Sequence, residues 1–354
     1  MAYLKGEVFL IHGGNVWQGE NPSQWLDFSA NLRPEGTPDW VHEALMNGME
    51  NARYYPDPSM KRAKAALSEY LEIPADCILP TAGGISAIQL ANRLPSSETV
   101  LLTPCFCEYE QFAASPIRKV SLLNARHEIA LPKTLELEEN SLVWLCNPMN
   151  PVGHAFEKKE IEGLLHQIES RNSYLVVDEA FIEYCPEHSV VNLIEKYDRL
   201  LITGSMTKIL GIPGVRLGYL CAQQQVLEKL KVHQLTWELS CFAEAVALAL
   251  PGHKEEIHAY SIRNAQNREM LVSGLQKLGI YVYPSQSACV LADFGMNVEG
   301  VAEKLKERKI LVRSCMSFDD INDGCHLRLA VKDEASNQIL IDTLREVLLC
   351  AEKA

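Results

Sequence analysis

The sequence LLITGSMTKILGIPGVRLGYL, residues 200–220, is the stretch from which the rest of the chain can be interpreted. It opens with apolar residues typical of a buried strand, continues through a polar bend and reaches Lys208. A second apolar run, 215–220, contains Arg216, eight residues after the lysine. Burying an ammonium group without a partner costs free energy, so the position of a lysine between two buried segments has to be explained. Either Lys208 lies on a surface loop, or it is a nucleophile held where it can lose its proton and attack an aldehyde.

Two further polar positions follow apolar runs that are predicted to be strands. The sequence VVDEA, residues 176–180, puts a carboxylate at the end of one run, and NPMNPVG, residues 147–153, follows another. Strands alternate with helices in this part of the chain, which predicts a mostly parallel sheet covered by helices. Ligands of such sheets bind at the carboxyl ends of the strands. We therefore expect Asn150, Asp178 and Lys208 to lie close together.

In this order and spacing, the three motifs resemble those of the fold-type I pyridoxal-phosphate (PLP) enzymes. The resemblance runs from His12 to the last helix. It is greatest for the branch that holds the histidinol-phosphate aminotransferases and the threonine-phosphate decarboxylases, the latter from cobalamin synthesis. It implies an α/β fold, with a large domain built on a mostly parallel sheet covered by helices and a smaller α+β domain. It also implies PLP as the cofactor, bound covalently by Lys208.

The same resemblance implies the other cofactor contacts. Asp178 would keep the pyridine nitrogen protonated, because an adjacent carboxylate favours the cation, and Asn150 would bond the phenolic oxygen. Phe106 would stack on the ring. The phosphate would be held by the glycine-rich start of a helix, by hydroxyl and guanidinium groups and by a tyrosine of the neighbouring subunit: Gly83, Gly84, Ile85, Ser205, Thr207, Arg216 and Tyr55. A helix cap, a core phenylalanine and a turn tyrosine are the structural alternatives.

Substrate contacts are implied at both ends of the chain. HGGN at 12–15 and DFSAN at 27–31 resemble the beginning of threonine-phosphate decarboxylases, whose N-terminal arm folds over the active site. Arg313 and Arg328 stand inside apolar strands, where a charge needs a partner, and the planar guanidinium group suits a carboxylate or phosphate. The implied contacts are His12, Asn31 and Arg313 at the substrate phosphate and Arg328 at its carboxylate. An internal salt bridge is the alternative for each arginine, and a structural role for His12.

The length of 354 residues exceeds what one core usually supports, so more than one domain is expected. We predict an N-terminal arm over 1–36 that joins the small domain and the active site, a large PLP-binding domain over 37–245 and a small domain over 246–354. The predicted elements include helices over 37–49 (with Thr37 as the N-cap and Pro38 at the first position), 58–71, 157–170 and 253–278, and strands over 280–283, 288–294, 310–314 and 326–331.

Composition argues against several classes of protein. The net charge of −13 argues against nucleic acid as a partner. No apolar run approaches the roughly eighteen residues of a membrane span, and the N-terminal sequence lacks the apolar core of a signal peptide, so a cytoplasmic location is expected. The eleven cysteines form no C-x-x-C pairs, which suggests reduced thiols and neither a metal site nor a disulfide framework.

The sequence thus predicts a PLP-dependent enzyme that acts on a phosphorylated amino acid. A homodimer is expected, because the tyrosine matched by Tyr55 serves the cofactor of the neighbouring subunit in the family. Many family members have tyrosine at the position of Phe181, whereas the threonine-phosphate decarboxylases have phenylalanine there. This favours α-decarboxylation of O-phospho-L-threonine to an amino-alcohol phosphate. A histidinol-phosphate or related aminotransferase is the alternative, and a non-catalytic ligand-binding protein of the same fold is a third reading.

Overall fold

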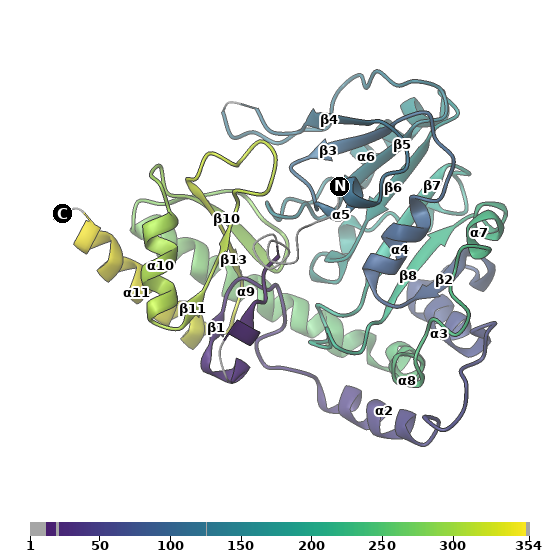
Figure 1. Cartoon of the computed structure of the whole chain (residues 1–354), viewed down its shortest axis with the longest axis horizontal. Coiled ribbons are helices and arrows are strands. Elements are labelled where there is room, and N and C mark those ends of the chain that lie inside the picture. Colours follow the sequence, from purple (N-terminus) through teal and green to yellow (C-terminus); the bar gives the residue numbers. More distant parts are fainter. Residues whose placement is uncertain (1–11, 19–20, 125, 352–354) are drawn as a thin grey trace.

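A seven-stranded sheet forms the centre of the larger part of the molecule (Figure 1). The computed structural model describes residues 12–18, 21–124 and 126–351. The strand order is β2-β8-β7-β6-β5-β3-β4, and β8 runs in the direction opposite to the other six strands. The strands are β2 (Ile78–Thr81), β3 (Thr99–Thr103), β4 (Ile117–Ser121), β5 (Leu142–Cys146), β6 (Tyr174–Asp178), β7 (Leu200–Ser205) and β8 (Gly218–Ala222).

Both faces of this sheet are buried. Along β5, Val143 and Leu145 pack into one apolar core, whereas Leu142 and Trp144 pack into another. Strands covered on both faces need continuous apolar runs, which is why the central strands are apolar throughout. The helices of this part are α2 (Asp39–Met49), α3 (Lys61–Leu71), α4 (Gly84–Ala91), α5 (Glu108–Phe112), α6 (Lys158–Glu169), α7 (Gln224–Lys231) and α8 (Cys241–Ala249), and α2 packs against α8. The predicted mostly parallel sheet covered by helices is confirmed.

A second, antiparallel sheet has the order β12-β13-β10-β9, and a parallel pair, β1 and β11, lies beside it (Figure 1). The strands are β1 (Leu26–Asp27), β9 (Tyr281–Val282), β10 (Cys289–Asp293), β11 (Ile310–Leu311), β12 (Arg313–Ser314) and β13 (His326–Ala330), and the helices are α9 (Lys254–Lys277), α10 (Glu299–Glu307) and α11 (Glu334–Ala351). Phe28 is fully buried in the apolar core of this part. The part of the N-terminal arm around Leu26–Phe28 is thus packed against the smaller part of the molecule, while the domain boundaries given above remain a proposal.

The first predicted helix begins one residue later than expected. Its N-cap is Pro38 and its first residue is Asp39, so the assignment of Thr37 as the cap is wrong. The hydroxyl of Thr37 instead donates to the carbonyl oxygen of Gly211, 3.1 Å away. A side chain that bonds to a distant loop is not available to cap its own helix.

Two other predicted elements also differ from the structure. The helix expected over 58–71 begins at Lys61, because Met60 adopts a left-handed conformation (φ 49°). The strand expected over 310–314 is two strands, since β11 pairs with β1 and β12 pairs with β13. The division into two strands depends on which strand each half pairs with, and the apolar pattern of the sequence does not indicate those pairing partners. No helix in the described parts of the chain is long and apolar enough to cross a membrane.

Candidate active site

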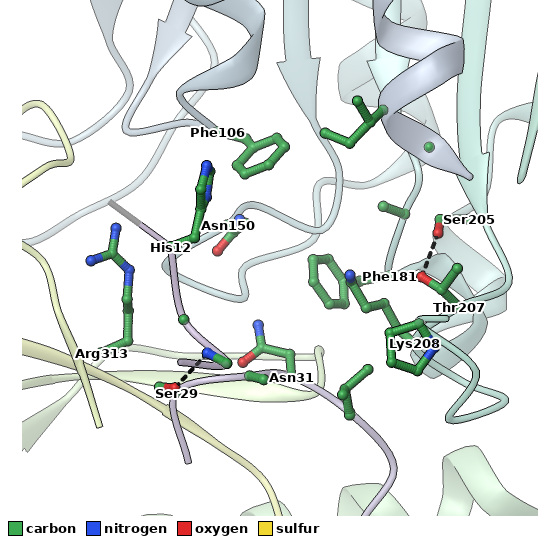
Figure 2. A pocket seen from close by; sticks show the side chains of 18 of the residues that line it. His12, Ser29, Asn31, Phe106, Asn150, Phe181, Ser205, Thr207, Lys208 and Arg313 are labelled. Atoms are coloured by element: carbon green, nitrogen blue, oxygen red, sulfur yellow. Dashed lines mark hydrogen bonds between the residues drawn. The ribbon is translucent and has the colours of Figure 1, made fainter. Parts of the chain in front are cut away.

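A cavity of about 670 Å³ lies where the ends of the large-sheet strands meet the smaller sheet and the arm (Figure 2). Most of the predicted site residues line it: His12, Asn31, Gly84, Ile85, Phe106, Asn150, Asp178, Ser205, Thr207, Lys208, Arg216, Arg313 and Arg328. Gly83 is the N-cap of α4 and directly precedes Gly84, the first residue of that helix. Tyr55 is the one predicted residue that lies away from the cavity.

Lys208 lies in the turn that follows β7, and its side chain opens into the cavity (Figure 2). Burial in the protein, reinforced by the positive charges of Arg216 and Arg328, lowers the pKa of its ammonium group from 10.5 to about 8, although Asp178 opposes the shift. A lysine with a lowered pKa has a much larger uncharged fraction at neutral pH than an ordinary surface lysine. Only this uncharged form attacks an aldehyde, so the surroundings favour a nucleophilic role.

The pH dependence of this reactivity gives a first prediction. In the cofactor-free protein, the rate at which an amine-selective reagent modifies Lys208 should rise with pH and level off, with a midpoint near 8. The sign follows because the reactive neutral amine replaces the ammonium group as the pH passes the pKa. The rate is measured by peptide mass spectrometry, with Lys208→Ala as the control for other lysines. A midpoint above about 10 would mean that the lysine behaves as an ordinary exposed one.

Asp178 ends β6 and is held by hydrogen bonds on both carboxylate oxygens. The hydroxyl of Tyr109 donates to Oδ2 at 2.5 Å, while the Thr203 hydroxyl and the Ala180 N–H donate to Oδ1, each at 3.1 Å. Burial raises the pKa of Asp178, and these hydrogen bonds oppose the rise. Donors directed at both oxygens favour the ionised form and fix its orientation. Tyr109, which stacks on Trp144 at a ring distance of 4.5 Å, was not among the predicted site residues.

The start of α4 forms a cradle with β7 and Arg216. Gly83 has a φ of +82°, and a Cβ there would lie 2.5 Å from Nη2 of Arg216. A Cβ on Gly84 would lie 3.3 Å from that of Ser205, whose hydroxyl is 2.9 Å from the Thr207 hydroxyl. Helix N–H groups, two hydroxyls and a guanidinium group therefore converge where only glycine leaves room. This donor set fits a phosphate, because the N-terminus of a helix favours an anion.

A glutamate that the sequence analysis missed also lies at this cradle. The Glu238 carboxylate accepts hydrogen bonds from the N–H of Ala82, at 3.0 Å, and from the hydroxyl of Ser86. Its neighbour Trp237 stacks on Tyr55, with 4.4 Å between the ring centres, and 79 % of Tyr55 is exposed. Within one chain, then, Tyr55 lies on the surface and does not contact the cavity.

Two arginines of the smaller sheet face the cavity. Arg328 donates from Nη1 to Oδ1 of Asn150, at 2.8 Å, and from Nη2 to the carbonyl oxygen of Ser29. Arg313 donates to the hydroxyl of Ser317 at 2.6 Å, and burial together with the charge of Arg328 lowers its pKa from 12.5 to about 10. The two buried cations disfavour each other, and an anion bound between them would relieve this repulsion.

His12 lies on the same side of the cavity as Arg313, across from Lys208, Ser205 and Thr207 (Figure 2). Its Nε2 lies 3.0 Å from Oε1 of Glu108. The thiol of Cys107 is also near, and the three side-chain donor atoms lie within 4.8 Å of one another. The spacing of these residues in the sequence did not predict this group.

The comparisons agree with this architecture. Residues 23–344 match the family model described as aminotransferase class I and II. The chain is 29 % identical to the threonine-phosphate decarboxylase of Salmonella typhimurium over 95 % of this chain and 96 % of that protein. The histidinol-phosphate aminotransferase of Clostridium acetobutylicum is structurally similar, with a TM-score of 0.83 and 26 % identity over 90 % of this chain and 98 % of that one.

A third match is a histidinol-phosphate aminotransferase from Sinorhizobium meliloti, solved in complex with pyridoxal-5'-phosphate. It has a TM-score of 0.78 and 18 % identity, covers 91 % of this chain and 90 % of that one, and shows the shared fold. The chain belongs to the aminotransferase class I and II family, and PLP is its cofactor. The resemblance inferred from the sequence motifs is thereby confirmed.

Proposed function

We propose that the protein is an L-threonine-O-3-phosphate decarboxylase that releases carbon dioxide from its substrate and leaves an amino-alcohol phosphate. The observation that carries the proposal is the presence of two cationic positions in the cavity besides the phosphate cradle. Arg328 offers one and Arg313 the other, with the His12 side chain on the same side of the cavity as Arg313. An amino acid that also carries a phosphate has two anionic groups to fill them.

The cofactor residues have separate tasks in this proposal. The cradle of Gly83, Gly84, Ile85, Ser205, Thr207 and Arg216 would hold the cofactor phosphate. Phe106 would pack on one face of the ring and Asn150 would bond its phenolic oxygen. Asp178 would hold a proton on the pyridine nitrogen, because an oriented carboxylate stabilises the cation. When bound, PLP supplies an electron sink for the bond that breaks at the substrate α-carbon.

The substrate residues would decide which bond breaks. The bond that stands perpendicular to the cofactor ring would be the one whose electrons the ring accepts. Rotation about the bond between the substrate nitrogen and the α-carbon would therefore select the reaction. His12, Asn31 and Arg313 would hold the phosphate end and Arg328 the carboxylate, so that the carboxylate leaves the ring plane. After carbon dioxide departs, Nζ of Lys208 would return a proton to the α-carbon. Phe181 lines the cavity beside these groups.

Two incubations test this assignment. With O-phospho-L-threonine alone, the enzyme should release carbon dioxide and form aminopropanol phosphate without any keto acid. With histidinol phosphate and 2-oxoglutarate, an aminotransferase would make glutamate. This second function is favoured by the structural similarity to the Clostridium enzyme. The cofactor residues alone do not separate the two reactions, because one fold can carry both. Glutamate formation without carbon dioxide release would replace the proposed reaction and leave the cofactor site intact.

The exposed Tyr55 supports a homodimer whose active sites lie at the subunit interface. A tyrosine that stacks on Trp237 but is still 79 % exposed in one chain has surface left to contact a cofactor cradle in a second copy. Sedimentation should therefore show a dimer, and Tyr55→Phe should release PLP faster during dialysis than the unchanged protein. A monomer with full activity would contradict the dimer. The cytoplasmic location stays a prediction.

A further inference from the structure

Asn31 of the arm lines the cavity, and its side-chain amide is buried there (Figure 2). Only 4 % of the residue is exposed, and its amide has no nitrogen or oxygen partner among the residues described, with the buried Cys289 thiol as a polar neighbour there. A buried polar group without a hydrogen-bond partner of this kind is destabilising, so the amide is suited to bind a polar group of a ligand. The backbone turns tightly at this point, with the N–H of Leu32 bonded to the carbonyl oxygen of Ala30 at 2.9 Å.

The two carbonyl groups that flank Asn31 are both bonded by one distant lysine. Lys332, two residues after β13, directs Nζ at the carbonyl oxygens of Leu32, 3.2 Å away, and Ala30, 3.5 Å away. The lysine is only 7 % exposed and is not among the residues that line the cavity. Its side chain therefore contacts the arm without being part of the cavity lining.

The base of this lysine is itself fixed. The amide of Asn337, a fully buried residue of α11, accepts from the N–H of Lys332 at 3.1 Å and donates to its carbonyl oxygen at 2.8 Å. A long side chain loses much rotamer freedom when it is held in this way, and several hydrogen bonds are needed to offset that cost. The backbone of Lys332 is therefore held by α11, and its ammonium group is bonded to the turn that carries Asn31.

We propose that Lys332 is a positioning residue that holds the Asn31 amide at the substrate phosphate without touching the substrate. The inference rests on the proposed function, because that function supplies the phosphate. Arg328 also bonds to the arm, at Ser29, but it lines the cavity and has its own contact with substrate in the proposal. A substitution of Lys332 should change the position of the arm without removing a group that contacts the substrate.

Steady-state kinetics of the full-length, PLP-loaded enzyme test the inference. Lys332→Met keeps the length of the side chain and removes its donors. The KM for O-phospho-L-threonine should rise roughly tenfold, about the loss of one hydrogen bond to a charged group, with kcat nearly unchanged. Lys332→Arg, which retains donors, should recover most of the affinity. Asn31→Ala should raise the KM, and adding Lys332→Met to it should have little further effect.

A second readout does not depend on turnover. Hydrogen exchange of the backbone amides in 27–33 should be faster in Lys332→Met than in the unchanged protein and unaltered in Asn31→Ala. Unchanged exchange in Lys332→Met, or effects on KM that multiply in the double variant, would overturn the role of Lys332. An enzyme inactive on O-phospho-L-threonine would overturn the proposed function instead, and the exchange comparison would still decide whether Lys332 holds the arm.

Discussion

Lys208→Ala should abolish turnover, with a loss of at least about 10⁴-fold, comparable to the loss of a nucleophile in other enzymes. The side chain lies in the turn after β7 and lines the cavity, and its pKa of about 8 gives it a larger uncharged, reactive fraction near neutral pH than an ordinary lysine has. The variant should also lack the visible absorbance that PLP acquires when it is bound to a lysine. Both quantities are measured on the purified protein after incubation with PLP.

Lys208→Arg is the matched control for charge. It keeps a cation between Asp178 and the arginines but provides no amine that can attack an aldehyde. It should therefore be as inactive as the alanine variant, while both retain the thermal stability of the unchanged protein. If Lys208→Arg kept more than about a tenth of the activity, the lysine would act as a charge and not as a nucleophile.

Asp178→Asn should lower kcat by about 10³-fold, in the range found when one oriented electrostatic partner of a reacting group is removed. The amide has nearly the same shape but no charge, so it cannot keep a proton on the pyridine nitrogen. Steady-state kinetics measure the loss. The thermal stability of the variant should not fall. Burial raises the pKa of the Asp178 carboxyl group, which reflects a desolvation cost of the carboxylate that the amide avoids.

Tyr109→Phe is a milder change at a residue that bonds to the same carboxylate. It removes the 2.5 Å hydrogen bond to Oδ2 but leaves the Thr203 and Ala180 donors in place. A loss of roughly tenfold is expected, much smaller than that of Asp178→Asn. Equal losses in the two variants would indicate that Asp178 acts mainly through its contact with Tyr109.

Much of the cavity could be predicted because strand ends and motif spacing are local in the sequence. Asn150, Asp178 and Lys208 each follow or end an apolar run, and parallel topology brings such ends to one edge of the sheet. The family resemblance then supplied the roles of the arginines and of the arm, which spacing alone does not specify. Those roles remain proposals, and the geometry is compatible with them.

The residues that were missed are those whose importance arises from contacts between distant segments. Glu238 bonds to the turn before α4, and Lys332 bonds to a turn about 300 residues earlier in the chain. Neither lies in a motif, and each has the appearance of an ordinary surface charge in the sequence. The division of the predicted strand over 310–314 has the same cause, because its pairing with β1 depends on where the arm lies.

The most direct test of the central claim is the chemical identification of the lysine that binds PLP. The protein is loaded with PLP, reduced with borohydride and digested, and the modified peptide is identified by mass spectrometry. The account predicts that the label is on Lys208, in the peptide that also contains Ser205 and Thr207. A label on any other lysine, or a protein that takes up no label at all, would contradict it.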